Sequence, residues 1–373
     1  MKKIATILSL LILFVSFTCL IKEVPTENSV NVYGWFGIIS KSVLEEFEKE
    51  TGIKVVYDVY DNNDTLEAKL LATNSGYDIV FPSFIPYAAR QSSMGAYMKL
   101  DKTLIPNLKN IGGIVTDKFY ASGADYDRLI PIFWGTTGIA YNDVLISSAL
   151  PNEVVSIDTI FNPSKVKKIK KLGISFPEES VDIFPQLKKY LHLQTPHKSQ
   201  EDIKSYLEHF QKIRQCIKKF STSTIINDLI SGEIAIAIGS SDNAWRAIRT
   251  AKRIGKRLKY IIPQGAGTLW VDCICIPEKA PHKENAHKFI NFLLRPEIAA
   301  KITNESGILV NIPEATKFFR KSIITDEQIC PTDPNILNSL MIGSPSKSIE
   351  ELDYDRSATR AWAQIKVNEI SLR

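Results

Sequence analysis

Strand-like and helix-like segments alternate along the first part of this chain, and this order restricts the fold more than any other feature. Apolar, β-branched segments predict strands, and segments with a serine start, apolar residues at helical spacing and a glycine stop predict helices. Strand, helix, strand, helix and strand are predicted in turn for residues 30–35, 40–52, 53–60, 64–76 and 77–83. This order predicts an α/β fold with a mostly parallel sheet and helices on both faces.

A long apolar run at residues 129–142, LIPIFWGTTGIAYN, has a Gly-Thr-Thr-Gly break. We interpret it as a strand that crosses from one compact body to another, since 373 residues with 44% hydrophobic content are enough for two domains. Further strands are predicted near residues 232–241 and 267–277. Ligands of open α/β sheets bind beyond the carboxyl ends of strands, so functional residues are sought at strand ends, in a crevice between the two bodies.

The N-terminus has the layout of a secretory signal peptide over residues 1–20. Two lysines precede an apolar run from Ile4 to about Phe17, which is too short to span a bilayer comfortably. We therefore expect an exported, periplasmic protein. Cys19 as a lipid-attachment site is an alternative that the sequence leaves open, because Thr18 stands where such sites usually have a smaller residue.

Composition argues against several classes of function. The formal charge of +5 arises from 46 basic and 41 acidic residues, so the field is weak and mixed, and no nucleic-acid partner is required. The five histidines and the cysteines show no metal-ligand spacing, and neither a nucleophile elbow nor a Ser-His-Asp order has local support. We expect no cofactor, no metal and no enzymatic activity, and we interpret the remaining cysteines as buried free thiols: Cys216, Cys273, Cys275 and Cys330.

The predicted strand at residues 267–277 contains one unusual pair. Alternation along a strand puts Trp270 and Asp272 on one face, and Val271 and Cys273 on the other. A carboxylate in so apolar a segment needs a partner. That partner is either a ligand cation or a lysine or arginine of the chain itself.

Several segments together resemble the bacterial periplasmic spermidine/putrescine-binding proteins, the capture subunits of polyamine ABC importers. The resemblance is carried by VYGWF with the following strand and helix pattern, IPIFWGTTGIAYN, GEIAIAIGSSDNAW, DCICIPEKAPHKENAHKFINFLLRPEIA and TRAW. It implies the two-lobed type II periplasmic-binding protein fold with a ligand cleft between the lobes. It also implies a monomer that passes a small cationic ligand, putrescine or spermidine, to an inner-membrane permease.

By this resemblance, each lobe is built from two separate parts of the chain. Lobe 1 would take residues 29–133 and 260–307, and lobe 2 residues 137–258 and 311–373. The hinge would lie near residues 134–136 and 308–310.

The resemblance also implies a set of ligand-binding residues. Aromatic faces attract ammonium groups and pack on methylene chains, while carboxylates must converge to offset the desolvation of a cation. Trp35 and Trp270 would stack on the ligand, and the Ser83 hydroxyl would lie at the cleft. The remaining positions would hold ammonium groups or line the cleft: Glu179, Asp182, Asp242, Asn243 and Asp272.

Other interpretations of these residues stay open. The two tryptophans could be ordinary core residues, and Glu179 and Asp182 could complement a helix N-terminus. The chain departs from the family at usual aromatic positions, with Ile38, Ser240 and Ile308, and Asn243 replaces an aspartate of the putrescine branch. The ligand could therefore differ from a simple polyamine, and a hydrolase that uses two cleft carboxylates is a further alternative.

Overall fold

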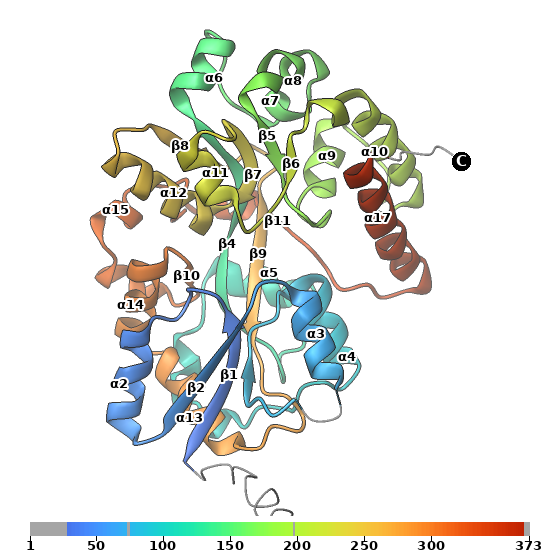
Figure 1. The fold of residues 1–373 in the computed structure, drawn as a ribbon. Coiled ribbons are helices and arrows are strands. Elements are labelled where there is room, and N and C mark those ends of the chain that lie inside the picture. Colours follow the sequence, from blue (N-terminus) through green and yellow to red (C-terminus); the bar gives the residue numbers. More distant parts are fainter. Residues whose placement is uncertain (1–27, 73–74, 197, 369–373) are drawn as a thin grey trace, which may run out of the picture.

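The computed structural model describes residues 28–72, 75–196 and 198–368 (Figure 1). The predicted signal peptide and Cys19 lie outside the described residues. The chain forms two lobes, one above the other in Figure 1, with strands running between them. None of the described helices combines the length and the apolar character needed to cross a membrane.

The N-terminal segment forms a three-stranded parallel sheet in the order β2-β1-β3. The strands are β1 (Ser29–Trp35), β2 (Lys54–Tyr60) and β3 (Ile79–Val80), and α2 (Lys41–Thr51) and α3 (Asn63–Leu71) connect them. Helix α2 ends where Gly52 adopts a left-handed conformation with φ of 69° and donates its N–H to the Glu48 carbonyl. The predicted β-α-β-α-β order is confirmed in this part of the chain.

A second sheet joins the two lobes. Its order is β11-β9-β4-β7-β5-β6, with β8 and β10 also paired to β4. Strand β4 (Ile130–Asn142) pairs antiparallel with β9 and β10 along its first half and with β7 and β8 along its second half. This second sheet is mixed, because β4 runs antiparallel to its neighbours in both lobes. The parallel pairing predicted from residues 30–83 is found in the first sheet. The strands are β5 (Ile174–Phe176), β6 (Lys219–Phe220), β7 (Ile236–Ser240), β8 (Leu258–Ile261), β9 (Thr268–Ile274), β10 (Leu309–Val310) and β11 (Met341–Ile342).

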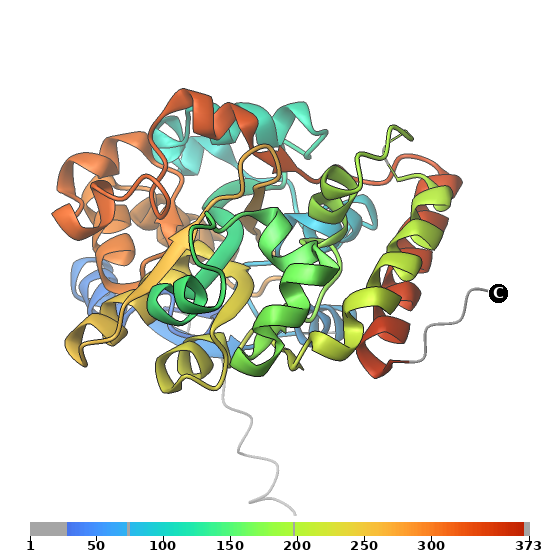
Figure 2. The same ribbon diagram turned by 90° about the horizontal axis from the view of Figure 1, so that it is seen from above.

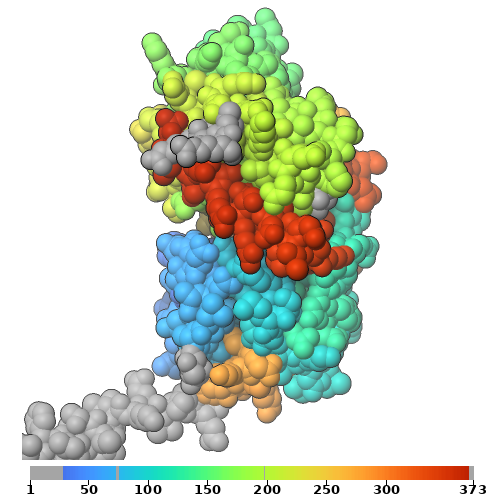
Figure 3. Space-filling view, turned by 90° about the vertical axis from the view of Figure 1, so that its right-hand side faces the viewer, coloured from blue at the N-terminus to red at the C-terminus, as the bar shows by residue number. Residues whose placement is uncertain are grey.

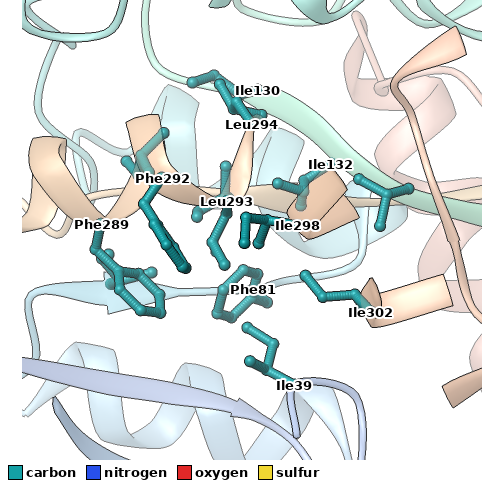
Figure 4. Packing of buried hydrophobic residues seen from close by; sticks show 14 of the residues in the cluster. Ile39, Phe81, Ile130, Ile132, Phe289, Phe292, Leu293, Leu294, Ile298 and Ile302 are labelled. Atoms are coloured by element: carbon teal, nitrogen blue, oxygen red, sulfur yellow. The ribbon is translucent and has the colours of Figure 1, made fainter. Parts of the chain in front are cut away.

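Each lobe has its own hydrophobic core. In the lower lobe, Phe81 and Ile132 pack against α13 (Lys283–Leu293) and α14 (Pro296–Ser306), as Figure 4 shows. The upper lobe is built around aromatic side chains, among which Phe210 and Trp362 have ring centroids 5.2 Å apart. The other α-helices are α4 (Ala89–Ser93), α5 (Ile114–Ala121), α6 (Asp143–Ala149), α7 (Ile157–Phe161), α8 (Pro163–Ile169), α9 (Phe184–Tyr190), α10 (Gln200–Ile213), α11 (Ile225–Ser231), α12 (Ser241–Arg253), α15 (Lys321–Ile324), α16 (Pro334–Ser339) and α17 (Ile349–Val367).

The C-terminal part of the chain passes between the lobes once more. Strand β11 pairs with β9, and residues 343–348 lead to α17, which packs beside α10 (Figure 2). Figure 3 shows this red segment along the junction between the two lobes. Before it, Lys118 of α5 donates hydrogen bonds to the Asn338 and Leu340 carbonyls, which ties residues near 340 to the lower lobe. The boundaries that we gave for the lobes stay a prediction.

The antiparallel pairing of β4 with β8 predicts a specific sensitivity to side-chain volume. At Gly138, an added Cβ would lie 2.3 Å from the Ile261 carbonyl oxygen, so the two backbones would have to separate. We expect Gly138→Ala to lower the free energy of unfolding by roughly 1–3 kcal/mol in urea titrations, the range of other overpacked sites. Gly112→Ala is the matched control, because no atom lies within 4 Å of its added Cβ. Equal stability of the two variants would contradict this account of the close pairing of β4 and β8.

Candidate ligand-binding site

Asp272 lies on β9 opposite Ser83, with which it forms an isolated antiparallel bridge. The predicted alternation is confirmed: Trp270 and Ile274 pack with one hydrophobic cluster, whereas Val271 and Cys273 belong to another. The four described cysteines are buried and free, as expected. Asp272 is only 6% exposed, so its carboxylate is held almost entirely by protein atoms.

A serine hydroxyl holds the Asp272 carboxylate by a hydrogen bond. Ser83 follows β3, and its Oγ donates a hydrogen bond of 2.7 Å to Asp272 Oδ1. Asn63 fixes this serine twice: its Nδ2 donates to Ser83 Oγ at 3.1 Å, and its Oδ1 accepts from the Ser83 N–H at 3.0 Å. The predicted pair of Ser83 and Asp272 is therefore brought together, and Asn63 is a positioning residue that our sequence reasoning missed.

Within the described part of the chain, no ion pair includes Asp272, so no lysine or arginine neutralises it. Burial raises the pKa of Asp272 to about 7. The Ser83 hydrogen bond opposes this rise, and the negative charges of Asp242 and Glu179 add to it. An unpaired buried carboxylate of this kind is costly unless something else supplies a positive charge.

Two tryptophans flank this carboxylate, and both are half-buried. Trp35 ends β1 and leans on Tyr60, with ring centroids 4.5 Å apart. The Trp270 ring lies against Gly135 of β4, where an added Cβ would come within 2.4 Å of the ring. Both indole N–H groups are buried and neither makes a hydrogen bond of good geometry, although the Trp35 N–H points at Asp272 closely enough to act as a weak donor that lowers its pKa. Buried donors whose hydrogen bonds are weak or missing, beside a carboxylate, are more typical of a binding site than of a finished core.

Glu179 and Asp182 lie in the turn between β5 and α9. The helix begins at Phe184, so both acids precede its first turn. Thr137 of β4 donates a hydrogen bond of 3.1 Å to Asp182. Burial raises the pKa of Asp182 to about 6, although this hydrogen bond lowers it. The Glu179 side chain is reached by solvent, yet the surrounding protein and the Asp182 carboxylate raise its pKa.

Asp242 and Asn243 occupy the first turn of α12, where the chain supplies its own cation. The Arg246 guanidinium pairs with Asp242 at 2.5 Å and donates to Asn243 Oδ1 at 3.0 Å. Sequence reasoning named both acceptors but missed the arginine, although Asp242 and Arg246 have the i,i+4 spacing of helix ion pairs. This part of the predicted site is already neutralised.

A cavity of about 590 Å³ lies beside these groups, with Ser83, Glu179, Asp182 and Trp270 among its lining residues. Asp272 lies behind Ser83. Ile38 and Ile308, which stand at usual aromatic positions of the family, do not line this cavity because they are buried in the hydrophobic core. Among the described residues, no group of three or more histidine, cysteine, aspartate or glutamate side chains is arranged to hold a metal ion.

Comparison with known proteins gives the class to which this fold and cavity belong. Residues 42–329 match the family model of the bacterial extracellular solute-binding proteins. The chain belongs to this family, and its two lobes around a cleft are those of a periplasmic-binding protein.

Two relatives are similar over nearly the whole chain. The putrescine-binding periplasmic protein SpuD of Pseudomonas aeruginosa is 38% identical over 348 residues, which cover 91% of this chain and 92% of that protein. The putrescine-binding periplasmic protein PotF of Escherichia coli is 31% identical over 345 residues, again 91% and 92% of the two chains.

Solved structures support the fold independently. The substrate-binding protein PotD of a spermidine/putrescine ABC transporter from Streptococcus pneumoniae superposes with a TM-score of 0.76 at 21% identity, and covers 92% of this chain and 99% of that one. The Tp0655 lipoprotein of Treponema pallidum gives the same TM-score at 21% identity, over 91% and 99%.

The raised pKa of Asp272 predicts how the ligand-free protein responds to pH. A carboxyl whose pKa is higher in the folded state stabilises the fold fully below its unfolded pKa, near 3.8, and this contribution is lost as the pH rises through about 7. In urea titrations without ligand, Asp272→Asn should therefore gain stability relative to the parent protein between about pH 4 and about pH 8. The exposed carboxylate variant Asp117→Asn should follow the parent at both pH values. A loss of stability in Asp272→Asn at the higher pH would mean that the carboxylate has a structural cation that we have not identified.

Proposed function

We propose that this protein captures a small organic amine of the polyamine type outside the cytoplasm and delivers it to an ABC importer. The observation that carries the proposal is that Glu179 and Asp182 line one cavity together with Ser83, whose hydroxyl binds Asp272 behind it. Among the described residues none of these three carboxylates takes part in an ion pair, and the charge of Lys366 opposes the rise in the pKa of Glu179 only in part. The two tryptophans beside them supply faces for methylene groups. The printed functions of SpuD and PotF, which are putrescine-binding proteins, support the same class of ligand.

The charges also suggest why closure would depend on the ligand. Asp272 and Ser83 belong to the part of the chain assigned to lobe 1, and Glu179 and Asp182 to the part assigned to lobe 2. The negative charges of Glu179 and Asp272 disfavour each other's ionisation. An ammonium group between them turns this repulsion into attraction, so ligand would draw the lobes together about residues 134–136 and 308–310. A permease that recognises the closed form would then receive loaded protein.

The ligand would be held without chemical change. Ser83, which already donates to Asp272, is fixed by Asn63, and neither contact gives it the base that an activated nucleophile needs. The protein would act as a monomer in the periplasm, and anchoring through Cys19 would be an additional feature of the mature form. Conversion of any bound amine into a product, detected by mass spectrometry, would contradict this part of the proposal.

A thermal-shift panel tests the ligand class. Putrescine, spermidine, cadaverine, basic amino acids and neutral sugars are added to the parent protein near pH 8, where the carboxylates are ionised. A ligand at a hundredfold excess over its Kd stabilises the folded state by about 2.7 kcal/mol, so a true ligand should raise Tm clearly. The absence of a shift with every amine, or a shift with sugars only, would refute the proposal.

The same panel with two variants locates the site. Asp272→Asn should remove the amine-dependent rise in Tm, because the remaining amide cannot balance an ammonium charge in a buried position. Glu284→Gln changes an exposed carboxylate on α13 and should leave that rise intact. An unchanged amine response in Asp272→Asn would place the ligand elsewhere.

A further inference from the structure

The cavity extends well beyond the carboxylates. From Trp270 and Ser83 its lining continues past β11 to residues of α9, α10 and α17, the helices in the upper right of Figure 1. We call this extension the distal arm. Its walls are mainly apolar and aromatic, and its lining includes Phe184, Leu193, Tyr206, Ile342, Tyr354 and Ala358.

The charges in the distal arm have the opposite sign to those near Trp270. Lys198 is almost buried and bonds Ser346 at 2.5 Å and Asp355 at 3.1 Å, so the acid there is already paired. Lys188 likewise pairs with Asp202 at 2.5 Å. Lys189 also lines the arm and takes part in none of the ion pairs found among the described residues. The cavity is therefore acidic at one end and weakly basic at the other.

On the side of α12, the acid that the structure describes is already paired with an arginine. The charge of Asp242 also raises the pKa of Asp272, and Arg246 holds the Asp242 carboxylate at 2.5 Å. The same guanidinium engages Asn243. An ammonium group directed toward α12 would have to displace the chain's own arginine, and one directed into the distal arm would meet lysines.

We propose that the ligand is a polyamine derivative with its ammonium groups confined to one end and an uncharged, mainly apolar acyl or aryl group at the other, which occupies the distal arm. This inference rests on the proposed function, since it needs an ammonium group at Asp272, Glu179 and Asp182. The inference concerns the part of the ligand that lies away from the carboxylates, about which the acidic end of the cavity gives no information. The apolar walls would bind a tail by excluding water, and the lysines would disfavour a second charged end.

Matched pairs of amines test the inference. Putrescine is compared with N-acetylputrescine and N-hexanoylputrescine, and spermidine with N-hexanoylspermidine, by calorimetric titration of the parent protein. Each methylene buried in the arm should tighten binding roughly threefold to fourfold. We therefore expect each hexanoyl compound to bind at least about tenfold more tightly than its unmodified partner, with the acetyl compound weaker than the hexanoyl one.

The outcomes separate this inference from the proposed function. Tighter binding of the unmodified amine in both pairs would overturn the inference and leave the proposed function standing. No binding of any of these amines would overturn both.

Two variants identify where the tail lies. Lys189→Glu adds an acid to the distal arm, so it should shift preference back toward unmodified spermidine by about tenfold or more. Lys171→Glu is the control with the same change of charge at an exposed lysine outside the cavity lining, and it should keep the preference of the parent protein. Thr359→Trp, at an exposed position of α17 that lines the arm, should abolish the dependence of affinity on acyl length. Persistence of that dependence in Thr359→Trp, or equal behaviour of the two lysine variants, would place the tail elsewhere and overturn the inference.

Discussion

The charge of Asp272 is the constraint on which the rest of the site depends. A carboxylate this deeply buried is destabilised by the loss of water, and one hydroxyl from Ser83 compensates only part of that loss. The fold therefore keeps a group near the middle of the molecule that is more stable when a cation joins it. Glu179 and Asp182 add further negative charge that lacks a paired cation, from the other wall of the cavity. In this account, the unpaired carboxylates lower the stability of the ligand-free fold and raise the affinity for a cationic ligand.

The crossing strands make this arrangement geometrically possible. Strand β9 pairs with β4 and also bridges to Ser83, so Asp272 and its hydroxyl partner are set by backbone pairing and not by a flexible loop. Gly135 leaves the room that the Trp270 ring needs on β4. Thr137, two residues further along β4, holds Asp182. One strand thus positions groups from both walls of the cavity.

The sequence predicted the fold class and the central pair better than the edges of the site. The β-α-β-α-β order and the alternation that places Trp270 beside Asp272 are local patterns, and both are confirmed. The mixed pairing around β4 and the turn that carries Glu179 depend on which distant segments meet, which periodicity does not encode. The ion pair of Arg246 with Asp242 could have been predicted from their i,i+4 spacing. The distal arm could not, because it forms only when α9, α10 and α17 come together in the fold. The assignment of ligand-binding residues remains a prediction.

The central claim is that an amine binds by supplying the positive charge that Asp272 and its acidic neighbours lack. Calorimetric titration of putrescine or its acylated derivative near pH 7, in buffers of different ionisation enthalpy, counts the protons exchanged on binding. Carboxyls with pKa values of about 6 to 7 are partly protonated there and must ionise around the ammonium group, so the account predicts proton release that disappears near pH 9. Amine binding near pH 7 with no proton release, or with proton uptake, would contradict it.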